Sequence, residues 1–171
     1  MDMLNKMNKR RKDQGFTLIE LMIVIAVIGI LAIVLVPKVG TIKTQAKGAG
    51  IETNVRMVQG YLQSKASKWV DQKASQVKVA EDVYNAFSDV DGNEKIKNPF
   101  NQGNVISNQV STDTSSSDNA LQIMDDSDFG DAKPGSTVVI IPDGTMAGTV
   151  TFTVYGIDKS GEIATTVKVT P

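Results

Sequence analysis

Glu20 is the residue whose position most restricts the functions that are compatible with this sequence. It lies near the start of an apolar segment, and none of the sixteen residues that follow it, Leu21–Val36, has a polar side chain. A carboxylate at the centre of a membrane-spanning helix costs about 2.5–3.5 kcal/mol, and less near the interface. Glu20 must therefore stay wet beside the lipid headgroups, become protonated or meet a cation.

A cation would appear if the chain were cut between Gly15 and Phe16. The new α-amine of Phe16 would lie about one helical turn from Glu20. A neighbouring copy, shifted along the helix axis, could then place its own amine against this carboxylate. A buried charge without a partner costs several kcal/mol, so such a pair would determine the register between copies.

The surrounding segment has the length of a membrane span. Phe16–Val36 would form about 32 Å of helix, which matches a hydrocarbon core of about 30 Å. The basic residues that precede it place that end in the cytoplasm; they are Lys6, Lys9, Arg10, Arg11 and Lys12. An ordinary secretory signal peptide is the alternative, but the segment is long for that role and no small-residue cleavage site follows Val36.

Pro37 ends the apolar segment. Because proline has no N–H, the carbonyl of Ile33 loses its helical partner and the helix kinks or loosens nearby. A simple bend at the outer interface and a functional stretch point both remain open.

The basic leader, the sequence G-F-T-L-I-E at Gly15–Glu20 and the apolar run that ends in proline together resemble the N-terminus of type IV pilins and pseudopilins. The resemblance covers about residues 9–56. It implies peptidase cleavage between Gly15 and Phe16, N-methylation of Phe16 and subunit assembly through Phe16 and Glu20. It also places helix-loosening residues at Gly29 and Pro37.

The same resemblance implies an organisation of the chain and a set of partners. Residues 1–15 would be a leader, 16–37 a transmembrane and polymerisation helix, and 38–171 the exported part. The partners would be a prepilin peptidase, a pilus assembly platform with its ATPase, membrane lipid before assembly, and further copies joined through the N-terminal helix. The precursor would cross the cell membrane once, with its N-terminus in the cytoplasm, before entering an extracellular pilus or a short wall- or periplasm-spanning filament.

Three functions are compatible with this organisation. The first is a structural subunit of a type IV pilus that serves adhesion, motility or aggregation. The second is a pseudopilin of a type II secretion or competence (DNA-uptake) system. The third is a monomeric, membrane-tethered binding module.

The chain is predicted to be α+β, with a long N-terminal helix that spans the membrane in its first half and packs on a small antiparallel sheet, as the resemblance also implies. The helix should run from about Thr17 to Val70, because apolar residues recur on one face: Ile51, Val55, Val58, Leu62 and Trp69. A short helix is expected at Val79–Val90, followed by an irregular stretch to about Ser136. Period-two patterns then predict strands at about 137–141, 149–155 and 162–169. A fourth strand near Leu121–Met124 is an alternative.

Composition limits the chemistry. The chain has no His and no Cys, which excludes Ser–His, Cys–His and His–metal sites, so we do not expect an enzyme. Many pilins of Gram-negative bacteria are similar in closing a loop with a disulfide, so the absence of Cys favours a Gram-positive pilin or a pseudopilin.

Loss of residues 1–15 would change the formal net charge of the chain from −1 to −4. A chain with this charge has no general attraction toward nucleic acid. A local basic patch would use Lys43, Lys47 and Arg56.

No cofactor is expected. Calcium is the alternative, at the acidic segments 89–94 and 125–131. Neither segment has the ligand spacing of a calcium loop. The first has its glycine at the fourth position and Phe100 where the bidentate glutamate should stand, and the second has no recognisable ligand pattern. Surface turns are the simpler interpretation of both.

Overall fold

The computed structural model describes residues 15–88, 96–110, 119–125, 129–147 and 150–171, without the side chains of residues 36–39. It divides into two compact units, Met1–Ile42 and Lys43–Pro171. Helix α1 (Leu18–Asp71) contributes to both of them. Its bounds lie within one residue of the predicted ones at each end.

In the first unit, α1 is apolar on all sides. Leu18–Leu35 is long and apolar enough to cross a membrane, with a mean hydropathy of 3.1, and none of it is buried. A helix that is apolar all round needs lipid or other apolar helices around it. The helix continues through Gly29 and Pro37, so the loosening expected at these two residues stays a prediction.

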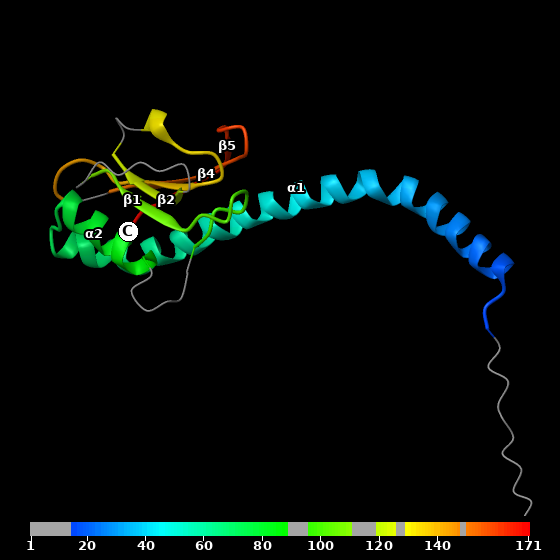
Figure 1. Ribbon diagram of the computed structural model, residues 1–171. Helices are drawn as coiled ribbons and strands as arrows, with labels where there is room; N and C mark the ends of the chain where they lie inside the picture. The colour runs from blue at the N-terminus through cyan, green and yellow to red at the C-terminus, as the bar shows by residue number, and fades with distance from the viewer. Residues whose placement is uncertain (1–14, 89–95, 111–118, 126–128, 148–149) are drawn as a thin grey trace, which may run out of the picture. The chain divides into compact units, whose positions relative to one another are not determined.

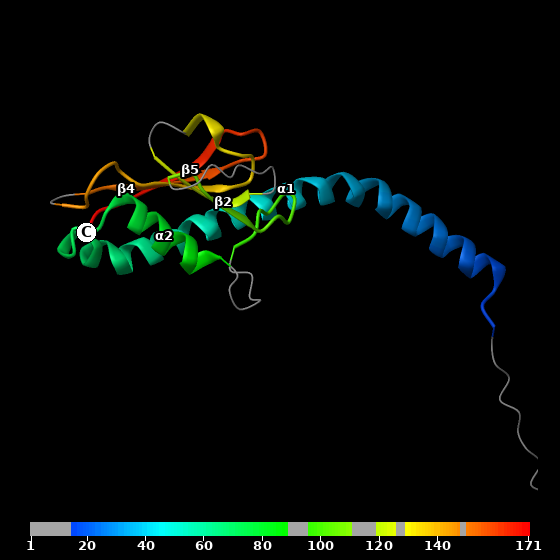
Figure 2. The same cartoon turned by 60° about the vertical axis from the view of Figure 1, so that its left-hand side comes forward.

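The second unit combines the rest of α1 with α2 (Gln76–Phe87) and a five-stranded sheet (Figures 1 and 2). The strands, in spatial order, are β1 (Val105–Asn108), β2 (Asn119–Met124), β3 (Thr137–Ile140), β4 (Phe152–Ile157) and β5 (Ile163–Val169). Strands β3, β4 and β5 form an antiparallel meander, while β1, β2 and β3 run parallel to one another. A short 3-10 helix, η1 (Phe129–Asp131), lies between β2 and β3.

The α+β class and the three-stranded meander are confirmed, and β2 confirms the fourth strand. The expectation of irregular chain from Asp91 to Ser136 is wrong at β1, which adds a parallel edge strand. All six residues of β2 are buried, as is usual for a strand with parallel neighbours that is covered on both faces. Such a strand lacks the polar alternation that identified the meander.

The second helix begins three residues earlier than predicted. Ser75 caps it, because its hydroxyl accepts a hydrogen bond from the backbone N–H of Lys78 at 3.2 Å. The helix ends at Phe87, and Ser88 closes it with a bond from its N–H to the carbonyl of Tyr84. The predicted final residues, Asp89 and Val90, lie outside the described residues.

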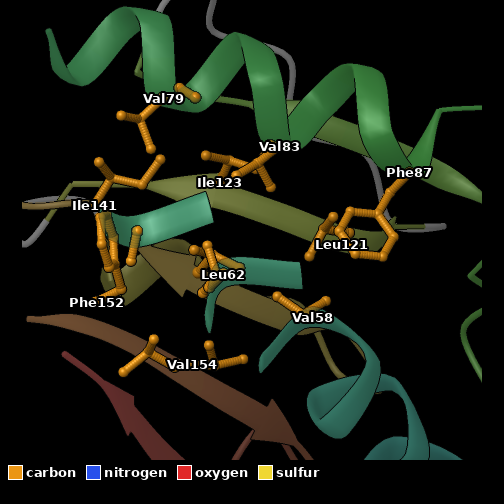
Figure 3. Packing of buried hydrophobic residues seen from close by; sticks show 14 of the residues in the cluster. Val58, Leu62, Val79, Val83, Phe87, Leu121, Ile123, Ile141, Phe152 and Val154 are labelled. Atoms are coloured by element: carbon orange, nitrogen blue, oxygen red, sulfur yellow. The ribbon is translucent and has the colours of Figure 1, made fainter. Parts of the chain in front are cut away.

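Helices α1 and α2 cover one face of the sheet and bury a common core. The predicted stripe of α1 is confirmed, with its five residues each at most 2% exposed. Figure 3 shows Val79, Val83 and Phe87 of α2 directed toward Leu121 and Ile123 of β2, with Leu62 of α1 nearby. Each large side chain buried in this way contributes about 1.5–3 kcal/mol.

A buried aromatic residue is linked to a carboxylate at the junction of the two helices. The indole Nε1–H of Trp69 donates to Oδ2 of Asp82 at 2.9 Å, and Lys78 Nζ donates to Oδ1 at 2.8 Å. The hydroxyl of Tyr61 donates to the backbone carbonyl of Asp82 at 3.0 Å. Burial raises the pKa of Asp82, but the hydrogen bonds from Lys78 and Trp69 outweigh it and hold the pKa below its usual value.

We predict that Asp82→Ala lowers the free energy of unfolding by about 1–3 kcal/mol, because the indole N–H of the buried Trp69 loses its acceptor. Urea unfolding of the full chain in detergent, followed by the fluorescence of this single tryptophan, measures the loss. Glu81→Ala, which removes an exposed acid next to Asp82, is the matched control and should have little effect. Equal stability of the two variants would contradict the prediction.

The pH dependence follows from the sign of the shift. Since the pKa of Asp82 is lower in the folded chain, its contribution is present above the unfolded value of about 3.9 and is lost as pH falls through the folded pKa. The stability difference between wild type and Asp82→Ala should therefore shrink below about pH 4. A difference that stays constant from pH 7 to pH 2 would show that the ionised carboxylate contributes nothing.

Candidate functional site

Glu20 and Thr17 form a reciprocal capping arrangement at the start of α1. The backbone N–H and the hydroxyl of Thr17 both donate to Oε2 of Glu20, each at 2.8 Å. In return, the backbone N–H of Glu20 donates to Oγ1 of Thr17 at 3.2 Å. This is a capping box, in which residues three apart satisfy each other's unpaired N–H groups at a helix N-terminus.

The cleavage candidate lies directly before this cap. Phe16 is 91% exposed, and Gly15–Thr17 precede the first helical residue. Gly15, Phe16, Thr17 and Glu20 line a hollow of about 410 Å³. The structure thus brings together Gly15, Phe16 and Glu20, and the peptide bond before Phe16 lies in an exposed segment that precedes the helix.

The arrangement leaves Glu20 able to accept further donors. Both bonds from Thr17 end on Oε2, so neither of them occupies Oε1. An ionised carboxylate can accept about four hydrogen bonds. The cap therefore holds the carboxylate in one orientation at the end of the helix, where an ammonium group from another molecule can still approach it.

Thr17 is the member of this site that the sequence analysis missed. Its signal was present, because T-x-x-E before an apolar run is the pattern of a capping box. Gly29 and Pro37 lie on the same helix but outside this hollow. Pro37 is seventeen residues beyond Glu20, which corresponds to about 25 Å of helix.

The two calcium candidates are largely untested. Segment 89–94 lies outside the described residues, as do residues 126–128 of the second segment. Within the described part of the chain, no three His, Cys, Asp or Glu residues are grouped so that they could hold a metal ion. Calcium binding stays an alternative for those segments.

Comparison with protein families returns one match, the prokaryotic N-terminal methylation motif, at residues 10–36. This match covers the N-terminal segment alone and supports a precursor of the type IV pilin or pseudopilin kind. The match contains Gly15, Phe16, Thr17 and Glu20, so the capping box lies inside the matched motif. Comparisons with curated proteins and with solved structures found no match.

The matched motif indicates what kind of protein carries such an N-terminal segment. It points to a structural protein, to processing by a prepilin peptidase and to assembly in a pilus-like system. The apolar helix Leu18–Leu35 fits storage in a membrane before assembly. The sheet and α2 lie beyond the matched residues, and the motif says nothing about what this part of the chain does.

The capping box makes a testable prediction. Thr17→Val removes the hydroxyl while keeping the branched shape, so the amide of Glu20 loses its acceptor. Loss of a Thr cap costs about 0.5–2 kcal/mol, and the amides of Glu20 and Leu21, which both bond to Thr17, should exchange with solvent about two- to thirty-fold faster. Hydrogen–deuterium exchange of the chain in detergent micelles measures this.

Thr17→Ser is the matched control, because it keeps the hydroxyl and should keep the protection. If the Val and Ser variants exchanged at the same rate as wild type, the side-chain cap would not hold the start of α1.

Proposed function

We propose that this chain is the structural subunit of a type IV pilus. The precursor is stored in the membrane, cut between Gly15 and Phe16, methylated at the Phe16 amine and polymerised through α1 into a surface filament. The observation that carries the proposal is a capped, ionisable Glu20 at the entrance of a helix that is exposed and apolar on every side.

The apolar helix supplies the driving force. Its exposed large side chains include Leu18 at 79%, Ile19 at 66% and Ile33 at 78% exposure. Lipid covers them in the precursor, and only other apolar helices can replace that cover outside the membrane. Further copies of the same chain are the simplest source of such helices.

Glu20 supplies the register. Once the helix leaves the lipid, an unpaired Glu20 carboxylate buried among apolar helices would cost several kcal/mol. Cleavage creates a positive α-amine at Phe16 in every copy. The amine of one copy can meet the carboxylate of the next, and because this contact joins two different surfaces it does not close on itself and generates a filament.

The proposal specifies partners and places. The precursor crosses the cell membrane once with residues 1–15 in the cytoplasm, where a prepilin peptidase cuts it. An assembly platform and its ATPase then extract the chain from the lipid into a filament outside the cell.

A pseudopilin of a type II secretion or competence system is the second candidate, because the matched motif serves both kinds of protein. Long filaments on the cell surface favour the pilus subunit, whereas neighbouring secretion or DNA-uptake genes favour the pseudopilin. A cleaved chain that stays monomeric would favour a membrane-tethered binding module instead.

Mass spectrometry of material sheared from the cell surface tests the proposal. We expect a mature chain that starts at Phe16 and carries a methyl group on its α-amine. A chain that retains residues 1–15 in that material would contradict both the pilus and the pseudopilin function.

Substitution of Glu20 tests the charge pair. Glu20→Ala should allow export and trimming but reduce incorporation into filaments at least tenfold, since breaking a buried ion pair costs about 3–5 kcal/mol. Immunoblots of sheared filaments and of membranes from the same cells give the two amounts.

Glu20→Gln separates the charge from the cap. Glutamine can take the same position in a capping box, but it has no charge to pair with an amine. We expect it to fail as Glu20→Ala does. Wild-type amounts of filament from the Gln variant would show that the cap, rather than the charge, is what assembly requires.

A further inference from the structure

A groove of about 450 Å³ opens on the surface of the second unit, beside α1. Thr44, Gly48 and Ile51 line it from α1, Phe100 from the loop before β1, Asp158–Ser160 from the β4–β5 turn, and Ala164 from β5. The groove wall at Gly48 has no side chain, and a Cβ there would meet nothing within 4 Å.

The walls of the groove are held in place by contacts of their own. Lys47 Nζ lies 5.5 Å from the centre of the Phe100 ring and donates to the Phe100 carbonyl at 3.3 Å. In the β4–β5 turn, Oδ1 of Asp158 accepts from the N–H and the hydroxyl of Ser160, both at 2.7 Å, and from the N–H of Glu162 at 3.0 Å. The groove is therefore preformed, which lowers the entropic cost of filling it.

We propose that this groove receives the apolar helix segment Phe16–Leu35 of a second copy of this chain. The inference rests on the proposed function, and it adds a contact that the pairing of Glu20 does not require. Polar residues contribute to the lining, but most of the surface exposed in the groove is apolar and favours an apolar occupant. Phe16–Leu35 holds most of the exposed large apolar side chains among the described residues.

The spacing along α1 supports this occupant. A copy whose Phe16 amine meets Glu20 of its neighbour is shifted by four residues, or about 6 Å along the helix. Three or four such shifts move a copy by twelve to sixteen residues. The end of its apolar segment, Leu35, then comes level with residues 47–51 of the first copy, which lie at the α1 wall of the groove.

The proposed contact joins two different surfaces of the chain. One wall of the groove lies on the helix that carries the apolar segment, with Thr44 nine residues beyond Leu35. A pocket on one surface that receives a different surface of the next copy is the kind of contact that extends without closing.

Gly48→Leu tests the inference, because it fills the groove from an open helical position. We expect cleaved and methylated chain at wild-type levels, an unfolding temperature that does not fall, and at least a fivefold loss of sheared filament. Gly60→Leu is the matched control, since Gly60 is a helical glycine of α1 that also has open space around it but does not line the groove. Wild-type amounts of filament from Gly48→Leu, or an equal loss from both variants, would overturn the inference.

A crosslinking experiment identifies the occupant. The chain has no cysteine, so a Lys159→Cys variant can be labelled at the groove rim, and at that position alone, with a maleimide–benzophenone reagent. After irradiation of the filaments, mass spectrometry should find the labelled peptide joined to peptides from residues 16–35 of another copy. Crosslinks only within one chain, or only to other parts of a second copy, would contradict the inference.

The two proposals can fail separately. Sheared material without any methylated, cleaved chain contradicts the proposed function and the groove inference together. Normal filaments from the Gly48→Leu chain contradict the groove inference alone.

Discussion

The constraint on which the proposed assembly depends is the cost of burying the Glu20 carboxylate without a cation beside it. Glu20 enters the apolar part of α1 already bound to Thr17, so its orientation is set before any other molecule arrives. In lipid the carboxylate can remain at the headgroup level, where the cost is small. Among packed helices an unpaired carboxylate would cost several kcal/mol, and in the proposed filament the amine exposed by cleavage at Phe16 is the cation that each copy brings.

The two parts of α1 differ in how their apolar side chains are distributed around the helix. In its first part the side chains are apolar all round and require cover from other molecules. In the second unit only one stripe is apolar, and it packs against the sheet together with α2 (Figure 3). The polar faces left over keep this unit compatible with water. One helix thus combines an apolar segment that needs cover from lipid or other helices with a segment that packs in the core of a folded unit.

Several parts of this structure could be predicted from sequence because their signals are local. The pattern from Gly15 to Glu20 and the length of the apolar run indicated the site, and alternating residues such as Phe152 and Val154 indicated the meander. Strand β1 was missed because it has only four residues and its two buried positions are polar, Ser107 and Asn108. The parallel pairing of β2 with β3 was missed because a fully buried strand has no period-two pattern to read.

A filament structure resolved to side chains tests the central claim most directly. The account predicts that the Glu20 carboxylate of each copy lies within about 4 Å of the Phe16 α-amine of another copy, the usual limit of an ion pair, with Thr17 still bonded to Glu20. A filament in which Glu20 faces open water, or in which the Phe16 amine lies far from every Glu20, would contradict it.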